Sequence, residues 1–249
     1  EKETGIQETV YQSEAELENK MIENLIFQGY ERIVIKSNSD LYSNLKTQIE
    51  KLNDVTFSED EWERFLKEYL DAPNEGIIEK TRKIQENHIY DFIFDDGHLK
   101  NIKIIDKKNI HNNFLQVTHQ VWGEGKSRNR YDVTVLVNGL PLVHIELKKR
   151  GVNMHEAFNQ IHRYSKESFN SENSLYKYVQ IFVISNGTYT RYFANTTAQN
   201  KNHYEFTCEW ADAKNRVIRD LEDFTATFFE KRTMLEVLTK YCVFDSNNT

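Results

Sequence analysis

Cysteine, proline and long apolar runs are all scarce in this sequence of 249 residues. The two cysteines, Cys208 and Cys242, are far apart and form no Cys-x-x-Cys pair, which excludes a disulfide framework or a cysteine-rich zinc site. No apolar stretch approaches the roughly 18 residues that a membrane-spanning helix needs, and the N-terminus has no apolar signal segment. We therefore expect a soluble, cytoplasmic protein without a membrane partner.

The sequence also lacks an excess of basic residues. Its 32 lysines and arginines stand against 39 aspartates and glutamates, which gives a formal net charge of −7. This balance excludes a protein that wraps nucleic acid through bulk positive charge, so any contact with DNA must be local. Carboxylates of a metal site would count toward the negative total, and a bound cation would neutralise some of them.

A phosphate-binding loop is missing as well. The segment Gly125-Lys126-Ser127 is similar to the end of a Walker motif, but the pattern needs glycine at position 120 and the chain has Gln120. We interpret the segment as an ordinary loop. This chain is therefore not expected to bind ATP by itself.

The apolar periodicity predicts an α/β fold with a mixed central sheet flanked by helices. Helical spacing covers residues 13–28, 40–52, 58–70, 77–86 and 153–168, and two further helices are predicted at 213–229 and 233–241. A period of two predicts strands at 31–36, 89–94, 102–105, 114–122, 131–137 and 142–148, and a hairpin made of 178–185 and 188–194. We expect one enlarged domain over residues 1–249, with a helical insertion at 38–86.

Three charged residues stand on two neighbouring predicted strands: Asp132 on the first, and Glu146 and Lys148 on the second. Two carboxylates near the ends of adjacent strands can hold a hard divalent cation such as Mg²⁺ and leave positions for water and a phosphate oxygen. Lys148 shares the strand face of Glu146 and can orient the attacking water or offset charge on the phosphate. A solvated strand face is the alternative. The mostly apolar segment 142–145 argues against it, because a buried carboxylate without a ligand is costly.

The side-chain period of two constrains the loop between these strands. A two-residue loop at Asn138-Gly139 would pair Asp132 with Ile145 and put the two carboxylates on opposite faces of the sheet. A three-residue loop would instead pair Asp132 with Glu146 and put both carboxylates on one face. We therefore predict a three-residue loop or a bulge around residues 138–140.

The residues named so far, with two from the next helix, form a known pattern. Gln160 and Tyr164 are one helical turn apart and share a face. The combination of Asp132, Glu146-Leu147-Lys148 and Gln160-x-x-x-Tyr164 resembles the RecB-like branch of the PD-(D/E)xK nucleases, although Tyr131 and not proline precedes Asp132. More closely, the segments 12–18, 130–150, 157–166 and 185–187 resemble the restriction subunit of type I restriction-modification enzymes.

This resemblance implies a PD-(D/E)xK restriction-endonuclease-like fold and a metal-dependent DNA endonuclease domain at the N-terminus of a larger protein. It implies Mg²⁺ as the cofactor, held by Asp132, Glu146 and the carbonyl of Ile145, with Lys148 as the catalytic lysine. Supporting or DNA-contacting roles are implied for Gln160, Tyr164, Glu18, Arg163 and Lys166. Of these, Glu18 on the first helix would hydrogen-bond a metal-bound water.

The implied partners are double-stranded DNA, the modification and specificity subunits, and a downstream helicase-like motor that uses ATP to translocate DNA before cleavage. Two other functions are possible: a catalytically silent DNA-docking module and a free-standing RecB-like nuclease. The intact Asp132, Glu146 and Lys148 argue against the first, and the long resemblance outside the site argues against the second. At single positions, Glu18 could be an ordinary solvated acid, and Tyr164 could simply pack against its own helix.

Overall fold

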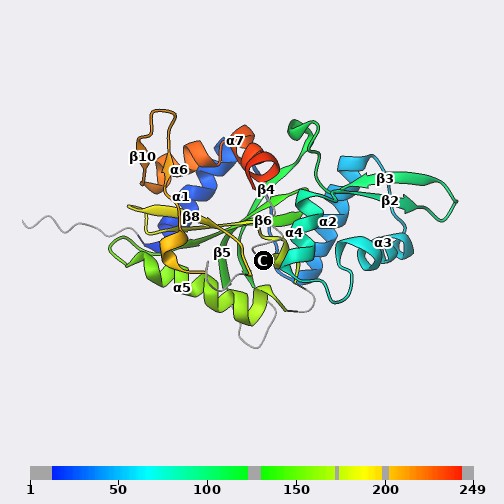
Figure 1. Cartoon of the computed structure of the whole chain (residues 1–249), viewed down its shortest axis with the longest axis horizontal. Helices are drawn as coiled ribbons and strands as arrows, with labels where there is room; N and C mark the ends of the chain where they lie inside the picture. The colour runs from blue at the N-terminus through cyan, green and yellow to red at the C-terminus, as the bar shows by residue number, and fades with distance from the viewer. Residues whose placement is uncertain (1–12, 123–129, 172–173, 198–201, 243–249) are drawn as a thin grey trace, which may run out of the picture.

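A mixed six-stranded sheet forms the centre of the computed structural model, which describes residues 13–122, 130–171, 174–197 and 202–242. In spatial order the strands are β1 (Glu31–Arg32), β4 (Leu115–Trp122), β5 (Arg130–Val137), β6 (Leu140–Leu147), β7 (Ile181–Ser185) and β8 (Thr190–Ala194). The pairs β1/β4 and β6/β7 are parallel, and the other neighbours are antiparallel. The predicted α/β fold with a mixed central sheet is confirmed (Figure 1).

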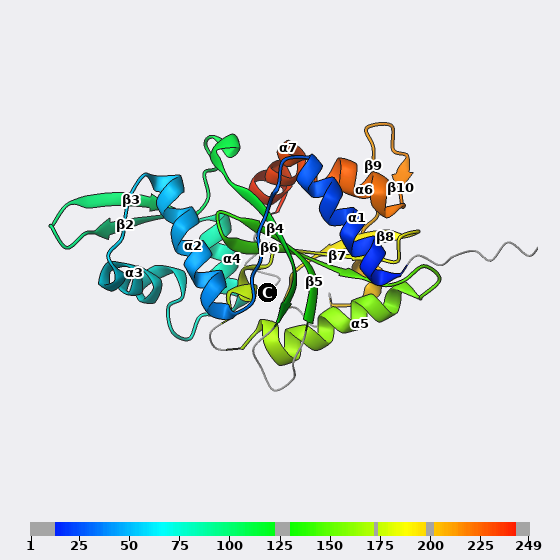
Figure 2. The ribbon, with the colours of Figure 1, turned by 180° about the vertical axis from the view of Figure 1, so that it is seen from behind.

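Strand β6 is buried along its whole length. Its sequence is almost entirely apolar, as expected for a strand that is paired on both sides and covered on both faces. The helices α1 (Glu14–Phe27), α6 (Leu221–Phe228) and α7 (Lys231–Glu236) lie on one side of the sheet, and α5 (Met154–Tyr164) lies on the other (Figures 1 and 2). Glu146 is therefore an acidic residue in an apolar layer of the protein.

Helix α1 forms where the sequence predicts it. The Ser13 hydroxyl accepts the backbone N–H of Glu16, and the Glu16 carboxylate accepts the N–H of Ser13, which closes a reciprocal cap. The buried apolar residues recur at helical spacing: Leu17, Met21, Ile22 and Leu25. The chain leaves the helix at Gly29, whose φ of +92° is accessible to glycine without strain.

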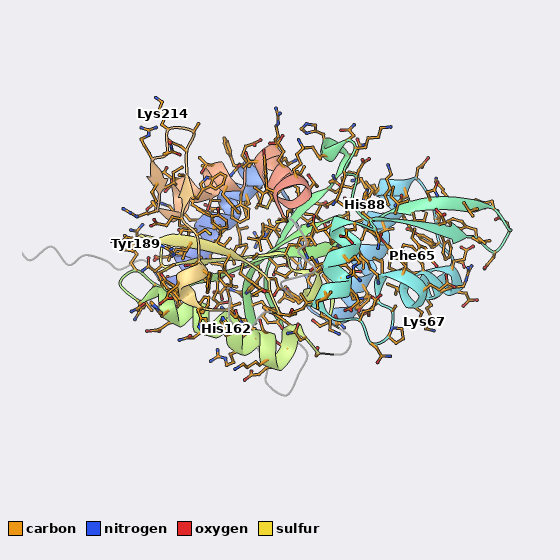
Figure 3. The ribbon with its side chains drawn as sticks, viewed as in Figure 1. Phe65, Lys67, His88, His162, Tyr189 and Lys214 are labelled. Atoms are coloured by element: carbon orange, nitrogen blue, oxygen red, sulfur yellow. The ribbon has the colours of Figure 1, made fainter. Side chains whose placement is uncertain are left out.

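The predicted insertion forms a helical lobe beside the sheet (Figure 1). It contains α2 (Asn38–Asn53), α3 (Glu59–Phe65), its continuation η1 (Leu66–Leu70) and α4 (Ile77–Gln85). The hairpin of β2 (Ile89–Ile93) and β3 (Leu99–Lys103) extends the lobe beyond the predicted boundary, and these two described strands pair only with each other. The rings of Phe57, Phe65 and Phe92 pack together inside the lobe, whereas Lys67 lies on its surface (Figure 3).

The prediction of a helix from residue 213 is wrong, because the helix α6 begins only at Leu221. The Asp212 carboxylate accepts the backbone N–H groups of Lys214 and Arg216, which folds the segment into a turn. That turn joins β9 (Trp210–Ala211) to β10 (Val217–Ile218). The polar turn residues therefore compete successfully with the helical pattern.

The remaining predicted elements are present with shifted ends. The strand expected at 31–36 is reduced to β1, the strand at 102–105 is part of β3, and the helix from 153 continues as η3 (Ser165–Phe169). Short helical segments complete the structure: η2 (Ile110–Asn112), η4 (Leu175–Tyr178), η6 (Tyr204–Phe206) and η7 (Val237–Tyr241). The segment 125–127 lies outside the described residues. Within the part of the chain that is described, no helix is long and apolar enough to cross a membrane.

Candidate active site

The β5/β6 hairpin carries Asp132 and Glu146, and its register decides whether the two carboxylates meet. The paired residues are Val137 with Leu140, Leu136 with Pro141, Val135 with Val143, Thr134 with His144 and Val133 with Ile145. Leu142 is therefore an extra residue on β6, which makes a β-bulge. Beyond the bulge, the same register places Asp132 opposite Glu146.

This register agrees with the predicted pairing of Asp132 and Glu146, and of the two predicted alternatives, a longer loop or a bulge, the structure has the bulge. The loop has two residues, and both Asn138 and Gly139 have positive φ, +52° and +83°. Such a turn matches the twist of the flanking strands. The bulge at Leu142 supplies the extra residue that we expected at 138–140. A two-residue loop with a bulge has the same parity as a three-residue loop, so both carboxylates reach one face.

Asn138 explains why the turn lies at this point of the chain. Its side chain is fully buried, and its amide donates to the carbonyl of Ile104 at 3.0 Å and to Oδ1 of Asn113 at 2.8 Å. Its own Oδ1 accepts the backbone N–H of Phe114 at 2.9 Å. Asparagine tolerates the left-handed backbone, and here every polar atom of its side chain also has a partner.

The two carboxyl groups lie in an environment with little water. Glu146 is fully buried, and the partly buried Asp132 accepts the backbone N–H of Leu147 at 2.8 Å. Burial is the largest cause that raises the pKa of each carboxyl group to about 7, and the charge of Glu146 raises the pKa of Asp132 further. Both effects disfavour the charged forms. A divalent cation between the groups would offset the burial and the mutual repulsion.

Two basic side chains flank Glu146 on the same face of β6. Nζ of Lys148 lies 3.3 Å from Oε1 of Glu146, and Nε2 of His144 lies 3.4 Å from Oε2. Burial lowers the pKa of His144 to about 4, so its ring is neutral at neutral pH and adds no compensating charge. Within the described structure, Oε2 of Glu146 has no hydrogen-bond partner. A buried acceptor without a partner is costly unless a ligand satisfies it.

The available donors fit Mg²⁺ better than zinc. Among the described residues, no three or more histidines, cysteines, aspartates or glutamates come together as metal ligands. Zinc sites use three or four such side chains, whereas Mg²⁺ is held by one or two carboxylates with water or substrate oxygens. Asp132 and Glu146 therefore fit the predicted Mg²⁺ site. Ile145 is fully buried next to Glu146, and its carbonyl stays a predicted ligand.

Helix α5 brings Gln160 and Tyr164 toward the carboxylates. The ring of Tyr164 is 2% exposed, and burial followed by the charge of Glu146 raises the pKa of its hydroxyl group. The hydroxyl donates to the carbonyl of Arg130 at 3.0 Å and accepts a hydrogen bond from the Gln160 amide. The ring is packed, as the alternative interpretation held, but its hydroxyl also ties α5 to the first residue of β5, the strand that carries Asp132.

Replacing Tyr164 by phenylalanine is expected to lower the free energy of unfolding by about 1 to 2 kcal/mol, because the carbonyl of Arg130 and the amide of Gln160 both lose a partner. Urea denaturation of the chain measures this difference. Tyr189→Phe is the matched control, since that ring is 51% exposed at the surface (Figure 3). The control should change the free energy by less than about 0.5 kcal/mol. Equal losses in both variants would contradict a specific role for the Tyr164 hydroxyl.

The predicted DNA-contacting residues Arg163 and Lys166 are exposed, on α5 and on its extension η3. The guanidinium group of Arg163 lies 5.8 Å from the centre of the Tyr164 ring. Both cations are therefore accessible to a phosphate backbone while their neighbour Tyr164 is anchored in the core. Their contact with DNA stays a prediction.

Helix α1 contributes two acids to the surroundings of the site. Glu18 is only 3% exposed, so the alternative of a solvated helix acid is wrong. Its Oε1 accepts a hydrogen bond from Nδ1 of His119 at 2.8 Å, and its Oε2 accepts one from the Gln120 amide at 3.4 Å. Glu14, one turn earlier, carries a charge that contributes to raising the pKa of Glu146. Two acids of α1 therefore interact with the sheet: Glu18 with β4, and Glu14 with Glu146 of β6.

Sequence reasoning missed Glu14, His119 and His144. The position of His144 two residues before Glu146 was a usable signal, because side chains alternate along a strand. Glu14 and His119 carried no such signal. Their proximity to the site depends on how α1 lies against the sheet, which local patterns do not specify.

A groove of about 1130 Å³ lies away from these residues, lined by β8, β9, α6 and α7. It contains both cysteines and the aromatic rings of Tyr192 and Trp210, but none of the predicted site residues. The catalytic chemistry predicted from the sequence is therefore separate from this mainly apolar groove.

Comparison with known proteins supports the resemblance seen in the sequence. Residues 11–201, which include all predicted site residues, match the family model "Type I restriction enzyme R protein N terminus". The type I restriction enzyme EcoprrI endonuclease subunit of Escherichia coli is 57% identical over 240 residues, covering 96% of this chain and 77% of that protein. The SauMSSORF170P endonuclease subunit of Staphylococcus aureus (strain MSSA476) is 35% identical over 243 residues, covering 96% of this chain and 25% of that protein. The chain therefore belongs to the family formed by the N-terminal part of type I restriction enzyme R proteins.

Proposed function

We propose that this chain is a metal-dependent DNA endonuclease domain with a PD-(D/E)xK fold. The observation that carries the proposal is the pair of Asp132 and Glu146, whose carboxyl groups are held together on adjacent strands with Lys148 at 3.3 Å from Glu146. Family membership supports the reaction, because the relatives are named as endonuclease subunits of type I restriction enzymes.

In this reaction the chain supplies the cation site and the groups that stabilise charge. Mg²⁺ held by Asp132, Glu146 and the carbonyl of Ile145 would polarise the scissile phosphate and activate water. Lys148 offsets the negative charge that develops on the phosphate, because its ammonium group is already oriented by Glu146. Glu18 would accept a hydrogen bond from a water at the cation, as the family resemblance implies.

The residues of α5 orient the DNA and hold strand β5 in position. Gln160 and Tyr164 hold the start of β5 against the helix, so that Asp132 keeps its position. Arg163 and Lys166 contact phosphates along the duplex, which fixes its orientation without reading its sequence. Sequence recognition therefore belongs to the specificity subunit of the complex.

The complete enzyme would also include the modification subunit and a helicase-like motor in the same polypeptide as this domain. The motor would hydrolyse ATP and translocate double-stranded DNA before cleavage. A silent docking module is disfavoured, because a fully buried Glu146 with an unsatisfied oxygen lowers stability without any gain unless a ligand binds there.

The function is tested by incubating closed circular plasmid with the complete restriction complex, Mg²⁺ and ATP, and by following ATP hydrolysis in the same samples. Loss of plasmid cleavage with retained ATP hydrolysis in an Asp132 variant supports the proposal. Undiminished cleavage would remove the hydrolytic centre from this hairpin.

Mg²⁺ is also expected to raise the thermal stability of the chain through this carboxylate pair. At ten times its dissociation constant, a ligand of the folded state adds about 1.4 kcal/mol to the free energy of unfolding. For a chain of this size the corresponding rise in Tm is about 3 to 5 °C. A Mg²⁺ titration with thermal scans measures it. Asp132→Asn and Glu146→Gln should abolish the rise, and Asp91→Asn, at an exposed residue of β2, should retain it. The same rise in all variants would place the cation elsewhere.

A further inference from the structure

Gln120 has an unusual backbone conformation. Its φ is +55° although it lies inside β4. The other described non-glycine residues with positive φ are Asp54, Asn74, Asn138 and Asn215. Aspartate and asparagine tolerate this region because their short polar side chains bond locally, whereas for glutamine it costs about 1 to 2 kcal/mol. Strain of this kind persists only where the surrounding structure enforces it, and it gathers at functional sites.

The strained residue stands opposite Asp132. Between β4 and β5, His119 pairs with Val133 and Val121 pairs with Tyr131. The position between these pairs belongs to Gln120 and Asp132, and within these two described strands the ladder is interrupted there. The irregularity is therefore located at the strand neighbour of a predicted metal ligand.

The left-handed backbone redirects the side chain of Gln120. Successive side chains on a regular strand point to opposite faces of the sheet. His119 and Gln120 nevertheless reach the two oxygens of the same carboxylate, that of Glu18, at 2.8 Å and 3.4 Å. The change of φ at Gln120 accounts for this, because it breaks the alternation and turns the amide onto the face that α1 covers.

Glu18 is held against β4 as a result. It is 3% exposed, both of its oxygens have a partner on β4, and α1 packs across β4, β5 and β6 (Figure 2). His119 is in turn held by Arg32, whose Nη2 lies 3.1 Å from Nε2 of the ring. Donation by Arg32 to Nε2 leaves the proton on Nδ1, where it bonds Glu18.

We propose that Gln120 is a positioning residue of the nuclease site. Its strained backbone turns the amide toward Glu18 and, together with His119, fixes the Glu18 carboxylate beside the strand of Asp132. The inference rests on the proposed nuclease function, in which Glu18 would accept a hydrogen bond from a water at the cation. A carboxylate free to rotate would lose much of the benefit of orientation, since small misplacements at a reacting centre are costly in rate. The strain at Gln120 is thus the structural cost of a well-placed Glu18.

Gln120→Gly separates positioning from stability. Glycine adopts positive φ without a Cβ penalty, so the variant keeps the backbone and removes the amide. In the complete restriction complex, plasmid cleavage is expected to fall about tenfold, while both DNA binding and ATP hydrolysis stay normal. The Tm of the chain should change little, because the relief of backbone strain offsets the partner that the buried Glu18 loses. Normal cleavage by Gln120→Gly, or a clearly lowered Tm, would overturn the proposal.

A double-mutant cycle tests whether Gln120 acts through Glu18. Glu18→Gln should lower cleavage by at least as much, and adding Gln120→Gly to it should cause no further loss, because coupled residues are not additive. Multiplied losses would overturn the proposal. Asp132→Asn in the same series distinguishes a failure of the proposed nuclease function from a failure of this inference. If it cleaves normally, the nuclease function fails and this inference with it; if it is inactive while Gln120→Gly cleaves normally, only the inference fails.

Discussion

Plasmid cleavage by the complete restriction complex is expected to fall at least about a hundredfold when Asp132 is replaced by asparagine. Asparagine has nearly the same shape, and its Oδ1 can still accept the backbone N–H of Leu147, which now lies 2.8 Å from the aspartate. The fold and the hairpin register should therefore survive. What disappears is the negative charge that, in the proposed site, holds Mg²⁺ together with Glu146. ATP hydrolysis should continue at its normal rate, because no nucleotide site is predicted in this chain.

The cleavage assay has an internal control in an exposed carboxylate. Asp91→Asn removes the same charge from the β2/β3 hairpin, outside the central sheet, and should leave cleavage unchanged. Lys148→Ala should also lose most of the cleavage activity, since it removes the ammonium group that lies 3.3 Å from Oε1 of Glu146. Normal cleavage by both Asp132→Asn and Lys148→Ala would show that these residues are structural. The domain would then be a DNA-docking module.

Gly139→Ala is expected to lower the free energy of unfolding by about 3 kcal/mol or more, and the Tm by about 6 °C or more. Gly139 has φ +83°, and a Cβ atom added there would lie 2.7 Å from Cα of Leu45 and 3.2 Å from its backbone nitrogen. Backbone atoms on the packed face of α2 cannot move aside as the end of a flexible side chain can. The strain of the left-handed conformation therefore adds to a steric clash with α2.

Gly97→Ala is the matched control for this prediction. Gly97 has φ +86°, nearly the same conformation, but no heavy atom lies within 4 Å of an added Cβ. Its replacement should cost only the backbone strain, about 1 to 2 kcal/mol. Thermal or urea denaturation of both variants gives the difference, which reports the close approach of the turn to α2. Equal losses at the two positions would show that this approach has no energetic weight.

The two largest predicted effects concern one hairpin. The turn at Asn138 and Gly139 starts the pairing of β5 with β6, and the bulge at Leu142 then shifts the register so that Asp132 faces Glu146. A variant that kept the turn but lost the bulge would move one carboxylate to the opposite face of the sheet. The packing of the turn against α2 therefore supports the geometry of the site and not only the stability of the lobe.

The sequence by itself determined the class of fold, and it predicted the strands that carry Asp132, Glu146 and Lys148, the residues of the proposed site. These features depend on local information: apolar periodicity separates helices from strands, and the charged residues interrupt an apolar strand where no structural reason requires them. The segments around them are also long enough to indicate the family, which the comparisons confirm.

The tertiary structure decided how these residues meet and which others join them. The bulge at Leu142 depends on strand register. Two other features join residues far apart in the sequence: the buried contact of Glu18 with His119 and Gln120, and the effect of Glu14 on Glu146. No local pattern encodes them, because they result from how α1 packs on the sheet and from which strain the packed structure can enforce. The turn at Asp212 shows the reverse: a local hydrogen-bonding preference that outweighed a helical pattern once the flanking segments could pair as β9 and β10.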